Sequence, residues 1–260
     1  MNTVSQHGLR ILVGAGSFAD ARAALHLVRH LQGNFSAGLG GVLIEDVDML
    51  NTCQIPDRRI ILSSGTTARA PSLSKIRTLL QADARAFRHL LAQTAGPHDT
   101  NWAFSREAGE LVSTALHAAQ GWDVLVLGYR KAHSAPGKIV LLQTSAGSSE
   151  KITEAFRRLS KNMPDASITL SVGPDAPPNR QVSNSHYYET FPEAMAALSR
   201  TNARALLVDL DNSPLHDHND LLRLLEAARC PIIIFHPSRM PALLAHSTQI
   251  PPTQQKQSGE

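Results

Sequence analysis

The sequence is poor in the residues and segments that mark several large classes of protein. Only 5% of its 260 residues are aromatic and only 18% are charged. No apolar run approaches the roughly 20 residues that a membrane-spanning helix needs, and no Gly-x-Ser-x-Gly elbow of a hydrolase occurs. The N-terminus carries no charged segment followed by a sufficient apolar stretch, so we expect no secretory signal. These absences predict a soluble, cytoplasmic protein that has no membrane partner.

Cysteine is also scarce, and basic charge is not concentrated anywhere. The two cysteines, Cys53 and Cys230, lie far apart without the spacing of a metal site, which indicates thiols in a reducing compartment. The formal net charge is +3, and the lysines and arginines are spread along segments such as 77–88 and 157–161. Because no basic run is interleaved with aromatic residues, these charges predict solvated helix faces and no nucleic-acid partner.

Short apolar runs do occur, and they alternate regularly with helical patterns. Most of the runs are apolar at successive positions, which is typical of strands that are buried on both faces of a parallel sheet. The alternation predicts an α/β fold with right-handed crossovers. The predicted strands are 10–14, 39–44, 123–128, 138–142, 167–172, 205–210 and 231–236, and the predicted helices are 19–31, 72–93, 105–119, 149–161, 191–199 and 219–228.

The chain contains an internal repeat. "RILVGAGSFADARAAL" from Arg10 aligns with "KIVLLQTSAGSSEKIT" from Lys138, with matched apolar and basic positions. We infer a duplication in which the first copy carries a long insert at 46–96 and the second copy ends in an additional helix and strand. The predicted domains are 1–132, a shortened 133–240, and a Gln- and Pro-rich tail at 241–260 that we expect to be disordered.

Two segments of these copies resemble the universal stress protein family. "NWAFSREAGELVSTALHAAQGWDVLVLGYR" is similar to the third strand, helix and fourth strand of that family, including the Asp-led strand Asp123–Gly128. "RCPIIIFHP", Arg229–Pro237, resembles the Cys-Pro lead into the family's last strand. The resemblance implies two Rossmann-like (adenine nucleotide alpha hydrolase-like) open parallel-sheet domains in tandem. They would be packed as an intramolecular pseudo-dimer, with a homodimer as the other arrangement. It also implies a regulatory or ligand-sensing role in the stress response, without catalysis.

The family's ATP-binding pattern is incomplete in both copies. The acidic residue that follows the first strand in ATP-binding members is replaced by Ala15-Gly16-Ser17 in one copy and by Gln143-Thr144-Ser145 in the other. After the fourth strand, Lys131 stands where a second glycine is expected, and no later Gly-Ser/Thr pair completes the pattern. The resemblance therefore implies a degenerate site with no certain cofactor. ATP or another adenine nucleotide is the candidate small-molecule ligand.

The turn from Gly14 to Ala19 is a candidate phosphate site, because it follows a strand and opens a helix. Its Gly-x-Gly-x-x-Ala spacing is that of a dinucleotide-binding turn, whose backbone N–H groups face a phosphate. The nearest acids that could bind a ribose, Glu45 and Asp46, lie farther along the chain than usual. The second copy builds the same turn without the two glycines, which favours the alternative of close helix–strand packing. The candidate nucleotide-binding residues are Gly14, Ala15, Gly16, Ser17, Gly128, Arg130 and Lys131. An NAD(P)- or other nucleotide-dependent enzyme that uses this turn is the alternative function.

A second loop, "DLDNSPLHDHND", gathers carboxylates and imidazoles after a predicted strand. Such groups can bind a divalent metal or carry out acid–base chemistry, so a metal-assisted enzyme is a third interpretation. The loop offers no third ligand at a known spacing. A polar loop in which Asp217 or Asn219 caps the next helix is therefore favoured, and no metal ligand or catalytic residue is assigned. The residues concerned are Asp209, Asp211, His216, Asp217, His218 and Asp220.

Overall fold

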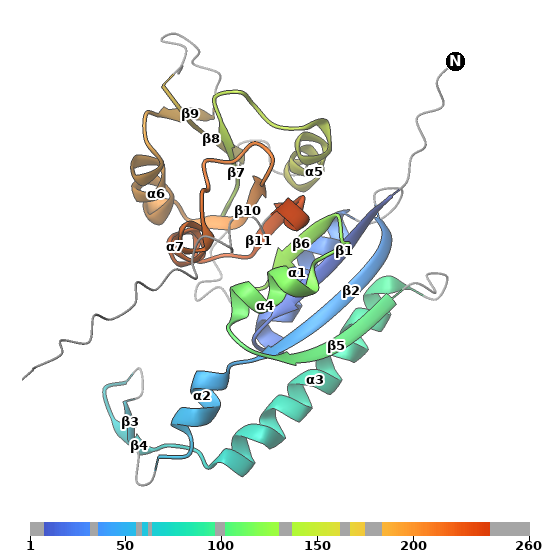
Figure 1. The fold of residues 1–260 in the computed structure, drawn as a ribbon, viewed down its shortest axis with the longest axis vertical. Coiled ribbons are helices and arrows are strands. Elements are labelled where there is room, and N and C mark those ends of the chain that lie inside the picture. The colour runs from blue at the N-terminus through green and yellow to red at the C-terminus, as the bar shows by residue number, and fades with distance from the viewer. Residues whose placement is uncertain are drawn as a thin grey trace, which may run out of the picture.

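The computed structural model describes residues 8–31, 36–55, 59–61, 64–96, 102–129, 137–161, 167–174 and 184–239. Nine of the described strands form one sheet, in the order β5-β2-β1-β6-β11-β10-β7-β8-β9 (Figure 1). The strands of this sheet are β1 (Leu9–Ala15), β2 (Ser36–Glu45), β5 (Trp102–Ala108), β6 (Val124–Leu127), β7 (Lys138–Thr144), β8 (Ser167–Val172), β9 (Ser185–Tyr188), β10 (Ala203–Asp209) and β11 (Ile232–Phe235). Helices α1 (Phe18–Leu31), α3 (Leu73–Ala95), α4 (Leu111–Ala118), α5 (Glu150–Ser160), α6 (Phe191–Arg200) and α7 (His218–Ala228) cover it.

Each half of the chain contributes its own set of parallel strands. In the first half β1 lies between β2 and β6, and β5 pairs with β2. In the second half β7 lies between β8 and β10, β9 pairs with β8, and β11 pairs with β10. Both halves therefore follow the order third, second, first, fourth strand, which is that of a Rossmann-like half-sheet. The predicted α/β class, with two parallel-sheet halves in tandem, is confirmed.

One strand, β11, joins the two halves. It pairs in parallel with β10 and in antiparallel with β6, where Phe235 lies opposite Val124 and Ile233 lies opposite Val126. The strand order is palindromic about β11, because equivalent strands of the two copies occupy matching places on its two sides. Among the described residues the first half has no fifth strand of its own, so β11 fills that position for both halves. The pseudo-dimer is one continuous sheet.

The strands are apolar at successive positions because helices cover both faces of the sheet. Helices α1, α3 and α5 pack on one face, and α4, α6 and α7 pack on the other. In β11, Ile233 and Phe235 point into the first layer, whereas Ile232 and Ile234 point into the second. All four are at most 1% exposed. Both layers contain side chains from both halves, so the halves share one hydrophobic interior.

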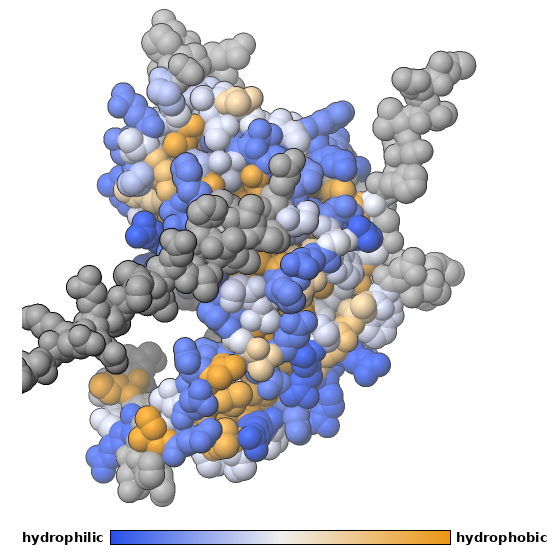
Figure 2. All heavy atoms as spheres, viewed as in Figure 1, coloured by the Kyte–Doolittle hydropathy of each residue, from blue (hydrophilic) through white to orange (hydrophobic). Residues whose placement is uncertain are grey.

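The insert between β2 and β5 forms helix α2 (Val47–Thr52), the hairpin β3 (Arg59–Ile61) and β4 (Thr67–Arg69), and the 23-residue helix α3. Phe87 and Leu91 of α3 are fully buried against Gly41 of β2, where an added Cβ would lie 2.9 Å from Leu91. The far end of the insert projects beyond the sheet, and Figure 2 shows apolar residues gathered there. The exposed large apolar side chains of the described residues all belong to this insert: Val47, Met49, Ile55, Ile61 and Leu79.

The predicted helix over 105–119 is partly wrong. Residues up to Ala108 belong to β5, and α4 begins only at Leu111, after Gly109. The strand lies at the edge of the sheet and keeps most of its length exposed, so it lacks the apolar run by which buried strands are found. The third strand that the family resemblance implies before this helix is present as β5. Strands β3, β4 and β9 have no counterpart among the predicted strands.

The remaining sequence predictions concern segments at the borders of the halves. The boundary between 132 and 133 falls within 130–136, and the tail 241–260 follows the last described residue, so both lie outside the described residues.

In the part of the chain that the structure describes, no helix combines the length and the apolar character needed to cross a bilayer.

Candidate functional site

The turn between β1 and α1 consists of Gly16 and Ser17. The Ser17 hydroxyl accepts a hydrogen bond from the N–H of Asp20 at 3.2 Å and donates to the Asp20 carboxylate at 2.5 Å. The N–H of Phe18 donates to Oδ2 of Asp83, which belongs to α3, at 3.0 Å. A carboxylate from the insert therefore lies at the N-terminus of α1, where the helix dipole favours a negative charge.

The glycines at this end of the sheet differ in what surrounds them. A Cβ on Gly14 would lie 3.0 Å from the Cβ of Ala115, so this glycine allows α4 to pack closely on β1. A Cβ on Gly128 would lie 2.7 Å from the backbone oxygen of Asp20, and the Gly128 N–H donates to the Gly14 carbonyl at 2.7 Å. Around Gly16, by contrast, the nearest atom to an added Cβ is 4.0 Å away. Packing thus explains Gly14 and Gly128, whereas a Cβ on Gly16 would make only an ordinary van der Waals contact with the Ile44 carbonyl.

The structure brings four of the predicted nucleotide-binding residues together at the carboxyl ends of β1 and β6: Gly14, Gly16, Ser17 and Gly128. Open α/β sheets bind their ligands at this position. Ala15 ends β1 and is fully buried. The other two predicted residues, Arg130 and Lys131, lie outside the described residues.

The predicted polar loop after β10 divides into separate contacts. Of the two residues predicted to cap α7, Asp217 does so, and its carboxylate accepts from the N–H of Asp220 at 2.8 Å. His216 lies on the surface, and its Nδ1 is 3.7 Å from the carboxylate of Asp220. His218 turns toward α4, where its Nε2 lies 3.5 Å from the Glu110 carboxylate. These four residues therefore do not form one site with the two aspartates at the start of the loop.

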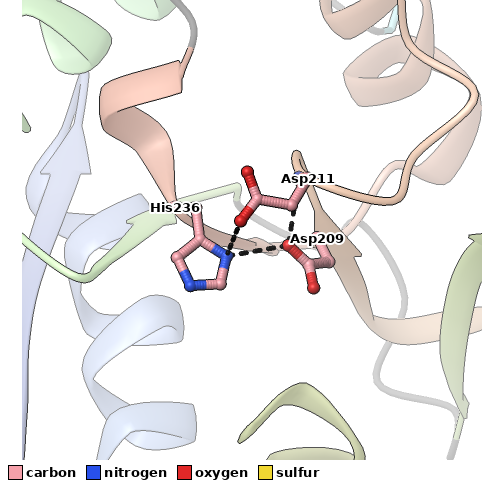
Figure 3. Close-up of side chains that lie close together, drawn as sticks. All are labelled: Asp209, Asp211 and His236. Carbon is pink, nitrogen blue, oxygen red and sulfur yellow. Dashed lines mark hydrogen bonds and ion pairs between the residues drawn. The ribbon is translucent and has the colours of Figure 1, made fainter. Parts of the chain in front are cut away.

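Asp209 and Asp211 instead meet His236, a residue that the sequence did not single out (Figure 3). Nδ1 of His236 lies 2.8 Å from Oδ1 of Asp209 and 3.3 Å from Oδ2 of Asp211. Asp209 is the last residue of β10, and His236 follows β11. Because these strands are parallel neighbours, both side chains reach the same edge of the sheet. The only sequence signal for this meeting is that polar residues follow two strands, and it becomes informative once the strand order is known.

Burial and hydrogen bonding compete at Asp209, whose side chain is only 1% exposed. Burial raises the pKa of Asp209, but His236, the hydroxyl of Ser149 and the N–H of Asp211 together hold that pKa below its ordinary value. The Ser149 hydroxyl is close enough to favour the charged carboxylate. However, neither this hydroxyl nor Oδ2 of Asp209 makes a hydrogen bond of normal geometry, and both atoms are buried. The site thus contains a charged, buried carboxylate with one unpartnered oxygen.

The backbone of His236 is fixed by the first half of the chain. Its φ of 55° is in the left-handed region, and its N–H donates to the carbonyl of Asp123, the residue before β6, at 3.1 Å. The imidazole and the two carboxylates, which we call the junction cluster, therefore lie where the two halves meet. Such a group can hold a metal ion, or the buried carboxylate can orient the imidazole for acid–base chemistry.

A hollow of about 310 Å³ lies between α3 and β5 and contains none of the residues above. Arg106 at its edge pairs with Glu45, and the guanidinium of Arg88 lies 6.0 Å from the centre of the Trp102 ring. The lining residues are Gln81, Ala84, Arg85, Arg88, Phe104 and Arg106.

Comparison with known proteins shows similarity only to solved structures. No family model matches the chain, and no curated protein matches it. Among solved structures, the chain is similar to a universal stress protein from Archaeoglobus fulgidus DSM 4304. The sequence identity is 10% and the TM-score is 0.44, over 86% of this chain and 95% of that chain. The α/β architecture of the present chain is established by its own strand order.

Proposed function

We propose that the chain is a universal stress protein-like regulatory protein, which acts in the cytoplasm by binding and not by turnover. The first of the two segments that resemble that family forms β5, α4 and β6, and the second contains β11. Strands β6 and β11 are the ones through which the halves pair. Because this pairing occurs within one chain, the proposal requires no second copy. In the first half, we propose that the nucleotide site is degenerate and that the protein's own Asp83 closes it.

The observation that carries this proposal is the hydrogen bond from the Phe18 N–H to the Asp83 carboxylate, at 3.0 Å. In nucleotide-binding α/β folds, the N-terminus of the first helix receives a phosphate. A carboxylate in that place is stabilised by about 0.3–1 kcal/mol, and by up to about 2 kcal/mol where it is partly buried. Two unit charges of the same sign 4 Å apart repel each other by about 4 kcal/mol at an effective dielectric constant of about 20. A phosphate would therefore have to displace Asp83 before it could bind.

A nucleotide-dependent enzyme is the second candidate, and it is favoured by Gly16, where no neighbour comes closer than 4.0 Å to an added Cβ. In that case the nucleotide backbone would approach Gly16 and Asp83 would move away. The acids that could bind a ribose are both engaged elsewhere, because Glu45 pairs with Arg106 and Asp46 caps α2 by accepting from the Met49 N–H at 3.0 Å. This arrangement counts against dinucleotide binding at the turn.

The two candidates differ in what the wild-type protein binds. Thermal unfolding and calorimetric titration would be carried out with ATP, ADP and NAD at millimolar concentrations. We expect no shift of the melting temperature for the wild type. For Asp83→Ala we expect ATP to raise the melting temperature by a few degrees, because the freed N–H groups of α1 can then donate hydrogen bonds to a phosphate. Gln81→Ala, an exposed position on the same helix, is the matched control and should behave like the wild type.

Each outcome has a separate meaning. Tight binding of NAD to the wild type would support the enzyme, and its turnover could then be assayed. Tight binding of ATP to the wild type would show that the first-half site is intact and that the proposed closure is wrong. If neither the wild type nor Asp83→Ala binds a nucleotide, the site is closed by something other than Asp83.

A further inference from the structure

We propose that the junction cluster, Asp209, Asp211 and His236, binds a divalent transition-metal ion such as Zn²⁺ or Mn²⁺ (Figure 3). One donor atom from each of the three side chains lies within 4.8 Å of the other two. Two of the side chains come from the ends of neighbouring parallel strands, and the third follows in the adjoining turn. This proposal does not depend on nucleotide binding in the first half, because no residue of the β1–α1 turn takes part.

Two of the distances within the cluster are close to those of a coordination shell. Two ligand atoms on a tetrahedral zinc site with bonds of about 2.0 Å are about 3.3 Å apart, and on an octahedral site with bonds of about 2.1 Å they are about 3.0 Å apart. The distances from Nδ1 of His236 to the two carboxylates are 2.8 and 3.3 Å. A metal ion can therefore take the place of the Nδ1 proton with small movements of the side chains.

The burial of Asp209 is an independent reason to expect a cation. Its side chain is 1% exposed, and Oδ1 is hydrogen-bonded to His236, whereas the buried Oδ2 makes no hydrogen bond of normal geometry, although the Ser149 hydroxyl lies close to the carboxylate. A buried carboxylate with an unsatisfied oxygen is costly unless a positive charge compensates it. A divalent ion bound at Oδ1, the oxygen that faces His236, supplies more positive charge than a protonated imidazole does.

The donor atoms also indicate which ions fit. An imidazole nitrogen favours first-row transition metals, whereas Mg²⁺ and Ca²⁺ prefer sites built from oxygen alone. Three protein ligands leave at least one position on the metal for water or for an atom of a second ligand, as in open zinc sites. The backbone bond from His236 to Asp123 fixes the imidazole relative to the first half, so the ion would link the two halves of the sheet.

The test is a metal titration of the intact 260-residue chain after treatment with a chelator. Calorimetry with Zn²⁺ and Mn²⁺ should show about one ion per chain. Asp211→Asn and His236→Asn should each weaken binding about tenfold or more. Asparagine is chosen at His236 because it tolerates the left-handed backbone. His216→Asn is the matched control, since its side chain is 84% exposed and lies outside the cluster, and it should keep the wild-type affinity. The absorption spectrum of the Co²⁺-loaded protein would report the coordination geometry, and circular dichroism would confirm that each variant folds.

Three results would overturn the proposal. The first is a wild-type protein that binds neither Zn²⁺ nor Mn²⁺ at concentrations up to the millimolar range. The second is an affinity that folded Asp211→Asn and His236→Asn leave unchanged, which would place the ion elsewhere on the surface. The third is an affinity for Mg²⁺ that equals the affinity for Zn²⁺ and does not change in His236→Asn. That result would indicate a site of oxygen ligands alone. If no metal binds at all, His236 serves to neutralise the buried Asp209.

Discussion

Truncation of one side chain in β11 should destabilise both halves of the protein together. Phe235 is 1% exposed, lies opposite Val124 of β6 and packs in the layer that α1, α3 and α5 share. Replacing a buried phenylalanine by alanine costs about 3–5 kcal/mol, because contacts are lost and a cavity remains. With a urea m-value of about 3 kcal/mol/M, Phe235→Ala should lower the unfolding midpoint by about 1–1.7 M.

The two tryptophans make this prediction specific. Trp102 and Trp122 both lie in the first half of the chain, whereas Phe235 lies at the end of the second. Tryptophan fluorescence therefore follows the unfolding of the first half, and far-UV circular dichroism follows the whole chain. We expect the two signals of Phe235→Ala to shift together. Leu198→Ala, in α6 of the second half, should also shift the fluorescence midpoint, because a buried leucine is worth about 2–5 kcal/mol.

The refuting result is a fluorescence midpoint that stays at its wild-type value while the dichroism midpoint falls. The halves would then unfold separately, and β11 would not couple them. Leu79→Ala serves as the control, because Leu79 is a large apolar residue that is 52% exposed, and its truncation should change the stability by no more than about 0.5 kcal/mol.

Two further predictions concern stability. Burial raises the pKa of Glu110, but the N–H groups of Ser113 and Val112, the Ser113 hydroxyl and His218 together lower it by more, so the folded-state pKa lies below its ordinary value. The carboxylate therefore stabilises the fold above the ordinary pKa of glutamate, and this contribution is lost as the pH falls through the folded-state pKa. Glu110→Ala should cost about 0.5–2 kcal/mol at neutral pH, and urea unfolding at a series of pH values should show this difference disappear in acid. Gly128→Ala should destabilise the protein by about 1–3 kcal/mol, because its Cβ would meet the Asp20 backbone. Gly16→Ala should leave the stability unchanged or raise it by up to about 1 kcal/mol. Thermal unfolding would compare the melting temperatures of the two glycine variants. A lower melting temperature for Gly16→Ala than for Gly128→Ala would contradict this reasoning.

The buried strands could be predicted because burial on both faces leaves a continuous apolar run. "IIIF" in β11 is such a run, and it predicts a strand there. The same four residues would suit any interior position of the sheet, so the place of β11 between the two halves could not be predicted from them. The edge strand β5, by contrast, has no apolar run from which a strand could be predicted over its whole length. Ser105–Ala108 are largely exposed, and their pattern resembles the first turn of a helix.

The two candidate sites depend on contacts between distant parts of the chain. Asp209 and Asp211 stand out in the sequence because they follow a strand, but His236 joins them only because β10 and β11 are neighbours. Asp83 belongs to a helix of the insert, and the described residues of the second copy include no equivalent helix with which to compare it. Strand order and the path of an insert are set by tertiary packing, and neither leaves a local pattern in the sequence.

The central position of β11 has a consequence for synthesis of the chain on the ribosome. The strand β6 is complete at Leu127, but its partner β11 begins only at Ile232. At about 5–20 residues per second, the ribosome needs about 5–20 s to make the intervening segment. During that time the nascent first half carries an apolar strand with one row of N–H and C=O groups unpaired. Such an edge is a template for pairing with another chain. We therefore expect newly made chains to depend most on chaperones in the time between the synthesis of β6 and the synthesis of β11.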